Sequence, residues 1–144
     1  SHIDALIKIS TSLGLSEWVI FHGPKFGAEK EVLLNNAAVM VLPSRAEGFP
    51  NVALEAGCVG IPVVLSKVGA AEDIRHAYGS GAVIFEVNDA KMLAHIIESV
   101  LKNVESYAAS AKAAANGAAL FTPQRMCEAL VGIYRSVTLS RTNL

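Results

Sequence analysis

Apolar residues follow two patterns that alternate along the chain as far as Val87. Apolar positions at helical spacing predict helices at residues 3–13, 29–37, 50–59 and 71–76. Short, continuous apolar runs stand between them and predict strands at residues 18–22, 39–43, 61–65 and 82–87. Strands of this kind, each separated from the next by a helix, are typical of a parallel sheet that is buried on both sides. The pattern therefore predicts an α/β fold, a doubly wound parallel sheet with helices on both faces.

After Asn88 the pattern becomes helical only. Asp89 is a suitable N-cap for a first helix, an alanine-rich helix is expected at residues 106–119, and Thr122 and Pro123 open a last helix that runs to Val137. We expect residues 1–121 to form one lobe and residues 122–144 to form a C-terminal helix and tail. A parallel α/β domain usually begins on a strand, whereas this chain begins on a helix, so we expect a first strand upstream.

Composition narrows the classes of function. The chain has 144 residues, of which 52% are apolar and 17% are charged, and a formal net charge of -1, so it suits one packed domain and offers no basic surface for nucleic acid. Its apolar runs are too short to cross a membrane and no signal peptide opens it, which favours a cytoplasmic location. We expect Cys58 and Cys127 to be buried and reduced. The four histidines lack the spacing of a metal site, so no metal is expected.

Two carboxylates stand out where packing would favour apolar residues. The stretch SRAEGFPNVALEAG places Glu47 in a loop and Glu55 in the helix that follows it, directly after the predicted strand 39–43. In an open parallel sheet, ligands bind beyond the carboxyl ends of the strands. Gly48 allows the backbone to approach a ligand closely, and Pro50 suits the first turn of a helix.

The start of this helix predicts an anion site. We expect the N–H groups of Asn51, Val52 and Ala53 to be free, and they lie at the positive end of the helix dipole, where phosphate is stabilised. Glu55 lies one turn further on, on the same face as Asn51, where its carboxylate could accept hydrogen bonds from ribose hydroxyls. Glu47 could do the same for a sugar.

Each feature also has a structural interpretation. A glutamate in an apolar helix is most often partly solvated or paired with an arginine, and a loop glutamate such as Glu47 is ordinarily solvated. Phe49 is more often a core residue than a stacking platform, and Arg45 is more often a surface charge than a phosphate ligand. The combination at this spacing, immediately after a strand, is far more specific than any one of its parts.

The stretch PSRAEGFPNVALEAGCVGIPVVLSKVGAAEDI resembles the retaining, GT-B-fold glycosyltransferases of group 1, also called family 4. That family has a glutamate, seven residues and a second glutamate, which Glu47 and Glu55 match. The resemblance extends from FHG at residues 21–23 through VGAAED at 68–73 to FEVNDA at 85–90. It implies a Rossmann-like C-terminal, nucleotide-sugar-binding lobe, and an enzyme that transfers a hexosyl or N-acetylhexosaminyl group with retention, as in polysaccharide biosynthesis.

The resemblance also implies a role for each matching residue. Glu47 would be the catalytic residue in contact with the donor hexose, and Glu55 would hold the ribose hydroxyls. The donor-binding set implied in this way is Gly23, Pro24 and Lys25 near the base, with Glu47, Gly48, Phe49, Pro50, Asn51, Val52 and Glu55. Pro50 has no N–H, so its neighbours would supply the backbone donors. The family needs no metal or other cofactor, because the helix start and an Arg and a Lys from an earlier loop meet the charge of the leaving diphosphate.

Two departures from the family pattern bear on the prediction. The strand and loop that carry the Arg and Lys, together with the acceptor-binding N-terminal lobe, would precede this chain, and the open sheet edge would favour self-association. The family often has a Gly-Gly pair where this chain has Gly69 and Ala70.

Other interpretations stay open. A sugar-nucleotide epimerase shares the two-lobe architecture, and a binding module could keep the fold without catalysis. The expected partners are a UDP-, GDP- or ADP-sugar and the N-terminal lobe, which could also bring the enzyme to a membrane surface. The sequence does not distinguish the donor sugar, the base or the acceptor.

We predict that this chain alone does not transfer sugar. Removing one preorganised charge-stabilising donor commonly lowers the rate about 100- to 1,000-fold, and here several would be missing. An assay with a nucleotide-sugar panel and mixed acceptors checks this. Acceptor-dependent transfer by the purified chain, with contaminating enzymes excluded, would contradict it.

Overall fold

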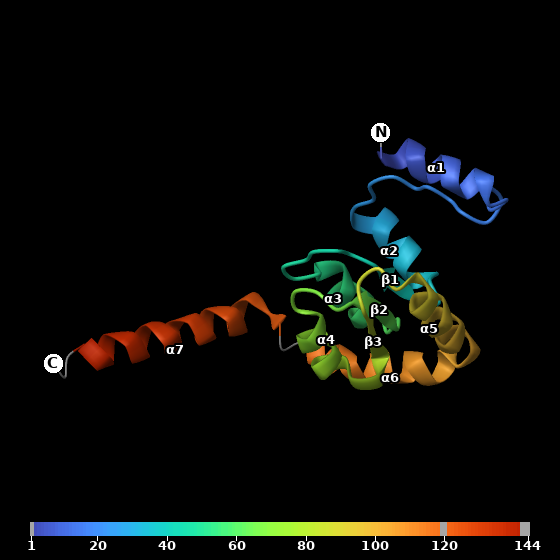
Figure 1. The fold of residues 1–144 in the computed structure, drawn as a ribbon. Helices are drawn as coiled ribbons and strands as arrows, with labels where there is room; N and C mark the ends of the chain where they lie inside the picture. Colours follow the sequence, from blue (N-terminus) through green and yellow to red (C-terminus); the bar gives the residue numbers. More distant parts are fainter. Residues whose placement is uncertain (1, 119–120, 142–144) are drawn as a thin grey trace. The chain divides into compact units, whose positions relative to one another are not determined.

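The chain divides into two compact units, residues 1–32 and 33–144. The computed structural model describes residues 2–118 and 121–141, with side chains for 3–112 and 121–135 (Figure 1). Parts of the predicted helix 106–119 and of the predicted tail, residues 119 and 142–144, therefore lie outside the described residues.

The first unit contains α1 (His2–Ser12), which confirms the predicted helix at residues 3–13. Gly14 ends it with a φ of 70°, a conformation that glycine adopts without strain, and the N–H of Leu15 donates to the carbonyl of Ser10 at 2.9 Å. Helix α2 (Gly27–Asn35) begins in this unit and extends past its boundary, two residues earlier at each end than predicted.

The predicted strand at residues 18–22 is wrong. These residues form a turn and an extended loop, with Trp18 83% and Ile20 73% exposed. β-branched and aromatic residues favour a strand through the neighbours that they pack against in a sheet. The described part of the first unit holds no strand that could pair with this segment, so its composition alone does not make it a strand.

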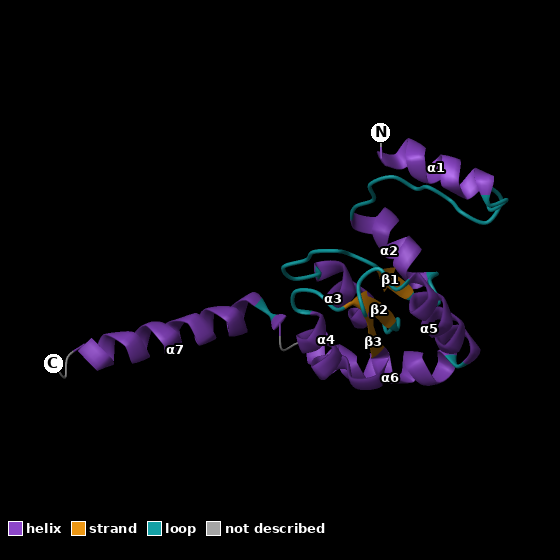
Figure 2. Ribbon diagram, viewed as in Figure 1, coloured by secondary structure: helices purple, strands orange, loops and turns teal. Residues whose placement is uncertain are grey.

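The second unit alternates strands and helices as the apolar pattern predicts (Figure 2). Its elements are β1 (Met40–Leu42), α3 (Asn51–Cys58), β2 (Val63–Ser66), α4 (Ala71–Tyr78), the short 3-10 helix η1 (Gly79–Gly81), β3 (Ala82–Phe85), α5 (Ala90–Lys102), α6 (Val104–Ala118) and α7 (Pro123–Arg141). Every predicted strand of this unit is present, although each is shorter than its apolar run.

The three strands form one parallel sheet in the order β1-β2-β3, which confirms the predicted fold class. Val41 pairs with Val64 in register, and Val64 pairs with Val83. All four residues of the central strand β2 are buried. A strand that is buried on both faces needs a continuous apolar run rather than an alternating one. This explains why three apolar residues in succession, VVL, begin β2.

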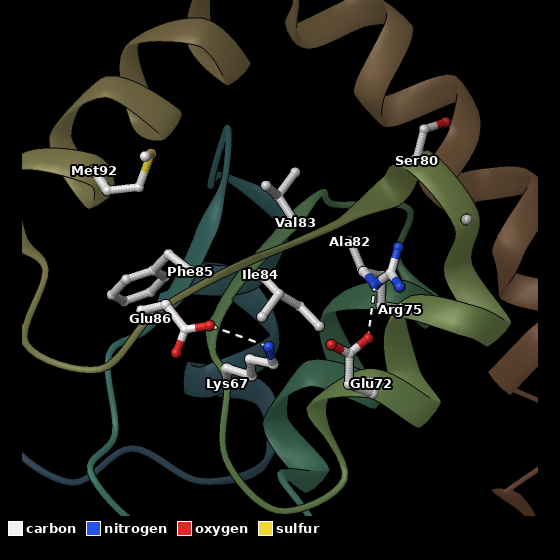
Figure 3. A pocket seen from close by; sticks show the side chains of 11 residues that line it. Lys67, Glu72, Arg75, Ser80, Ala82, Val83, Ile84, Phe85, Glu86 and Met92 are labelled. Carbon is white, nitrogen blue, oxygen red and sulfur yellow. Dashed lines mark hydrogen bonds and ion pairs between the residues drawn. The ribbon is translucent and has the colours of Figure 1, made fainter.

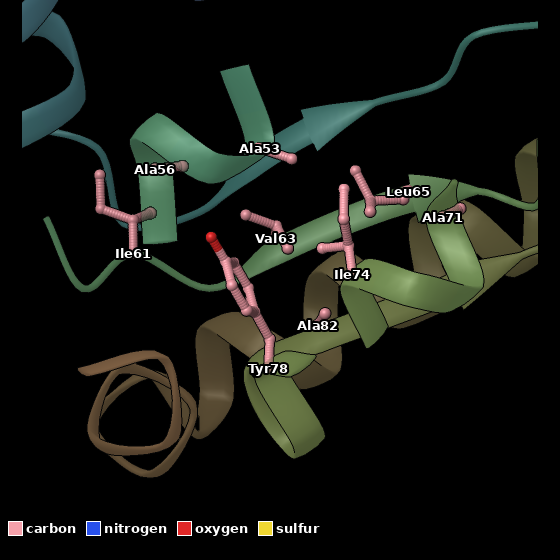
Figure 4. Packing of buried hydrophobic residues seen from close by; sticks show 9 residues of the cluster. All are labelled: Ala53, Ala56, Ile61, Val63, Leu65, Ala71, Ile74, Tyr78 and Ala82. Atoms are coloured by element: carbon pink, nitrogen blue, oxygen red, sulfur yellow. The ribbon is translucent and has the colours of Figure 1, made fainter. Parts of the chain in front are cut away.

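The two faces of the sheet carry separate apolar cores. On one face, Val63 and Leu65 of β2 pack with residues of α3, α4 and β3 and with one residue of the loop before β2, as Figure 4 shows: Ala53, Ala56, Ile61, Ala71, Ile74, Tyr78 and Ala82. On the other face, Val64 and Phe85 pack with Val100 of α5, and Tyr107 of α6 covers the edge of this cluster. Neighbouring residues of a strand point to opposite faces, so β2 contributes to both cores.

Tyr78 is the largest fully buried side chain among the described residues. Its hydroxyl donates to the carbonyl of Leu54 in α3 at 3.3 Å, and burial raises its pKa to about 12. The ring lies against Gly57, where an added Cβ would overlap the ring atoms. A glycine inside a helix lowers helix stability, and here it allows α3 and the Tyr78 ring to approach closely.

The predicted caps are present at two helix starts. The Asp89 carboxylate accepts a hydrogen bond from the N–H of Met92 at 2.8 Å, and the Thr122 hydroxyl accepts one from the N–H of Arg125 at 3.3 Å. Asn88, at a φ of 67°, turns the chain between β3 and α5.

The predicted burial of the two cysteines is wrong, because both Cys58 and Cys127 are exposed and carry free thiols. Each lies in an apolar stretch of helix, but on a side that the neighbouring elements leave uncovered. Among the described residues, no helix is both long enough and apolar enough to span a membrane.

We predict that Gly57→Ala lowers the free energy of unfolding by about 1–3 kcal/mol, because the new methyl group forces the buried Tyr78 ring from its place. The matched control is Gly132→Ala in α7, where an added Cβ meets nothing within 4 Å. The control should leave stability unchanged or raise it by up to about 1 kcal/mol. Denaturant unfolding of both variants gives the two values, and a stabilised Gly57→Ala protein would refute the packing argument.

Candidate functional site

The candidate site lies at the carboxyl ends of β1 and β2. Strand β1 leads into the loop 43–50, which carries Glu47 and Gly48, and β2 leads into the loop 67–70 before α4. Parallel strands bring their carboxyl ends to the same edge of a sheet, so the two loops meet there. This is the place where the sequence predicts a ligand.

The Glu47 carboxylate is half-buried and held by its own loop. The Ser44 hydroxyl donates to its Oε1 at 2.7 Å. The carbonyl of Ser44 in turn accepts a hydrogen bond from the hydroxyl of Ser66, a residue at the end of β2 that is only 2% exposed. The structural interpretation expected Glu47 to be solvated like an ordinary loop glutamate. The hydrogen bond from Ser44 and the partial burial show that it is not freely solvated.

The loop after β2 holds the backbone of the Glu47 loop. The N–H of Ala70 donates to the carbonyl of Gly48 at 3.1 Å. Gly69 has a φ of 52°, and an added Cβ there would overlap the carbonyl oxygens of Glu47 and Gly48. Gly69 and Ala70 stand where the family often has two glycines. The chain keeps the glycine at position 69, where both the backbone conformation and the lack of space require one.

The start of α3 differs from the prediction. Pro50 occupies the N-cap position, the N–H of Asn51 donates to the carbonyl of Phe49 at 3.0 Å, and the N–H of Ala53 donates to the carbonyl of Pro50 at 2.9 Å. Two of the three N–H groups expected to be free therefore have acceptors. Of the three N–H groups, that of Val52 has no acceptor among the described residues.

Gly48 and Phe49 are both exposed. An added Cβ at Gly48 would meet nothing within 4 Å, and its φ lies outside the left-handed range, so neither packing nor conformation requires a glycine there. The Phe49 ring is 39% exposed and packs against the ring of Phe121, with 5.2 Å between the centroids and 55° between the planes. Phe49 is thus part of an aromatic pair at the surface rather than a core residue.

Glu55 and Asn51 lie four residues apart on α3 and therefore on the same side of it. Glu55 is half-buried and takes part in an interaction within the chain. A hollow of about 520 Å³ lies beside this helix start, lined by Phe49, Asn51 and Leu54 together with residues at the beginning of α7. The sequence contains no local signal for this hollow or for the Phe49–Phe121 contact, because the two sides are far apart in the chain.

Gly23, Pro24 and Lys25 lie in the first unit, whereas the other predicted site residues lie in the second. The Lys25 ammonium forms an ion pair with Glu29 at 2.9 Å, and Gly23 has a φ of 65°.

A second hollow, of about 610 Å³, lies along the open edge of β3 (Figure 3). Its charged side chains pair with one another, Lys67 with Glu86 at 3.1 Å and Arg75 with Glu72 at 2.9 Å. Neither Glu47 nor Glu55 lines it. Exposed ion pairs of this kind contribute little free energy, and natural sheets use such charges to protect an edge strand, so we place the candidate site at the Glu47 loop instead.

The described residues contain no group of three or more His, Cys, Asp and Glu side chains that could hold a metal ion. The groups that the described loop and helix start offer to a ligand include the Glu47 carboxylate and the N–H of Val52. Carboxylates suit hydroxyl donors, and an N–H at a helix start suits an anion. A ligand with both kinds of group would match the site.

Comparison with known proteins gives a family and named relatives. The family model described as "Glycosyl transferases group 1" matches residues 2–117. The D-inositol 3-phosphate glycosyltransferase 1 of Catenulispora acidiphila is 34% identical over 133 residues, which cover 92% of this chain and 32% of that protein. The D-inositol 3-phosphate glycosyltransferase of Salinispora tropica is 31% identical over 140 residues, 96% of this chain and 29% of that protein. The chain spans about a third of the length of these relatives.

Two solved structures are similar to this one. Sucrose-phosphate synthase from Thermosynechococcus elongatus superimposes with a TM-score of 0.79 at 25% identity, covering 94% of this chain and 34% of that chain. Anabaena HepE, solved in complex with UDP, superimposes with a TM-score of 0.73 at 25% identity, covering 99% of this chain and 37% of that chain.

We predict opposite effects on stability at the two glycines of the site. Gly48→Ala should leave the free energy of unfolding unchanged or raise it by up to about 1 kcal/mol, because the methyl group meets nothing and the unfolded chain loses freedom. Gly69→Ala should lower it by at least about 1 kcal/mol, since an L-residue at this φ is strained and the methyl group overlaps the Glu47 loop. Denaturant unfolding compares them, and equal effects would refute the assigned loop contact.

Proposed function

The chain belongs to the group 1 glycosyltransferases, and we propose that it is the donor-binding part of a retaining enzyme of that family. The enzyme would move a hexosyl or N-acetylhexosaminyl group from a nucleotide sugar to a glycan, a lipid or another acceptor. An N-terminal lobe of the same protein would complete the active site.

The observation that carries this proposal is the arrangement of the loop after β1. It holds the Glu47 carboxylate through Ser44, next to a glycine that neither packing nor backbone conformation requires. A glycine that the fold does not need is consistent with close approach of a ligand to the backbone. The loop lies at the carboxyl edge of the sheet, where α/β proteins bind ligands.

We assign the parts of a nucleotide sugar to this site as follows. Glu55, on α3, would hold the ribose hydroxyls, and Glu47 would contact the hexose. The backbone at Phe49, Asn51 and Val52 would face the sugar and the diphosphate. The N–H of Val52 is the best-placed donor, because it would not have to break an existing hydrogen bond in order to bind the ligand. The bound UDP of the similar Anabaena protein supports a nucleoside diphosphate as the common part of the ligand.

The chemistry proposed for this lobe is electrostatic rather than covalent. The diphosphate leaves with negative charge, and the N-terminal end of α3 would stabilise part of that charge. An Arg and a Lys from outside this chain would meet the rest. The segment with Gly23, Pro24 and Lys25 would lie near the base, as the family resemblance implies.

The test is donor binding by the full-length protein. Calorimetry with UDP-, GDP- and ADP-sugars should identify one nucleotide series that binds, and the binding should not require a metal ion. Hydrolysis of the donor without dependence on an acceptor would instead favour an epimerase, and binding without any turnover would favour a non-catalytic module.

We predict that Glu55→Gln weakens donor binding by about 1.5–3 kcal/mol, or roughly 10- to 150-fold, because it removes a charged acceptor from the ribose hydroxyls. Glu72→Gln is the matched control, since Glu72 is an exposed acid on α4 whose partner is Arg75. The control should bind the donor like the wild type. A Glu55→Gln protein with a lowered melting temperature and wild-type affinity would show that Glu55 is a structural acid.

A further inference from the structure

The Glu47 carboxylate and the Glu47 peptide are each fixed by a different residue. Ser44, in the same loop, donates a hydrogen bond to carboxylate Oε1 at 2.7 Å. Gly69, in the loop after β2, lies against the carbonyl oxygens of Glu47 and Gly48 so closely that any side chain would overlap them. The first contact orients the side chain, and the second sets the path of the backbone.

Both contacts are anchored in the buried part of the sheet. The Ser66 hydroxyl, 2% exposed at the end of β2, donates to the carbonyl of Ser44. The N–H of Ala70 donates to the carbonyl of Gly48 at 3.1 Å, and Ala70 directly precedes α4, whose first residue Ala71 is part of the core. The two loops therefore behave as one unit attached to β2.

Neither residue is part of the apolar core. Ser44 is only half-buried, Gly69 is exposed, and neither belongs to the two apolar clusters. A hydrogen bond from a serine to one oxygen of a carboxylate leaves the other oxygen available for a hydroxyl of a ligand, in a defined direction. Supporting contacts of this kind determine whether a binding group is held in its productive geometry.

We infer that Ser44 and Gly69 are positioning residues for Glu47, and that together they set how strongly the site holds the sugar part of its donor. This inference rests on the proposed function, because it takes the sugar as the group that Glu47 contacts. The nucleotide part would depend on Glu55 and would be affected less. The signature is thus a change in the ratio of two affinities, for the nucleotide sugar and for the same nucleotide without its sugar.

The test uses the full-length protein, with UDP-glucose and UDP as the probe pair, or the GDP or ADP pair if that series binds. Ser44→Ala should lower the affinity for the nucleotide sugar relative to the nucleotide by about 2- to 12-fold, the net range of one hydrogen bond. Ser44→Thr keeps the hydroxyl and should restore the wild-type ratio. A merely structural role for Ser44 would lower both affinities together.

The second arm compares two glycines that have similar positive φ values. Gly69 and Gly79 have φ values of 52° and 56°, but an added Cβ meets the Glu47 loop at Gly69 and nothing within 4 Å at Gly79. Gly69→Ala should lower the affinity ratio by up to roughly 10- to 150-fold, the range for losing a hydrogen bond to the charged Glu47 carboxylate. Gly79→Ala carries backbone strain without the overlap and should keep the wild-type ratio.

The outcomes separate this inference from the proposed function. If the wild type binds no nucleotide sugar in the panel, the proposed function is wrong and the inference is wrong with it. If the wild type binds and Glu47→Gln lowers the ratio, but Ser44→Ala and Gly69→Ala do not, the inference alone is overturned. Should Gly69→Ala fail to fold, the Ser44→Ala and Ser44→Thr pair decides the result.

Discussion

The parallel pairing of β1 with β2 is the constraint on which the rest of the second unit depends. The pairing brings the ends of two strands, more than twenty residues apart in sequence, to one edge, where the hydroxyl of Ser66 reaches the carbonyl of Ser44. The same pairing places Gly69 and Ala70 against Glu47 and Gly48. Without it, the Glu47 loop would have only its own local contacts, and the carboxylate would sample many directions at the surface.

The packing of the helices serves the same arrangement. Helix α3 must begin directly after the Glu47 loop and must also lie close to β2 and α4, which Gly57 allows by leaving space for the Tyr78 ring. The hydrogen bond from Tyr78 to the carbonyl of Leu54 ties α3 to α4. Helix α3 is held by buried contacts on one side, and its other side carries the exposed Asn51 and the half-buried Glu55.

Three glycines in this region illustrate different physical requirements. At Gly57 a neighbouring ring excludes a side chain, and at Gly69 both the backbone conformation and the Glu47 loop exclude one. At Gly48 nothing in the described structure does so. The contrast matters for function, because a glycine without a structural requirement is consistent with a ligand that comes close to the backbone, whereas the other two are explained by the fold itself.

Sequence patterns alone determined the helices and strands of the second unit, the capping by Asp89, the parallel fold class and the spacing of Glu47 and Glu55. These features depend on local preferences and on the periodicity of burial, which neighbouring residues express directly. Only the tertiary structure decided that residues 18–22 form no strand and that Cys58 is exposed. It also decided which residues hold Glu47, because the contacts of Ser66 and Gly69 join segments about twenty residues apart. A strand requires a neighbouring strand, and a side chain is buried only where another element covers it. Neither condition can be predicted from the residues of the segment alone.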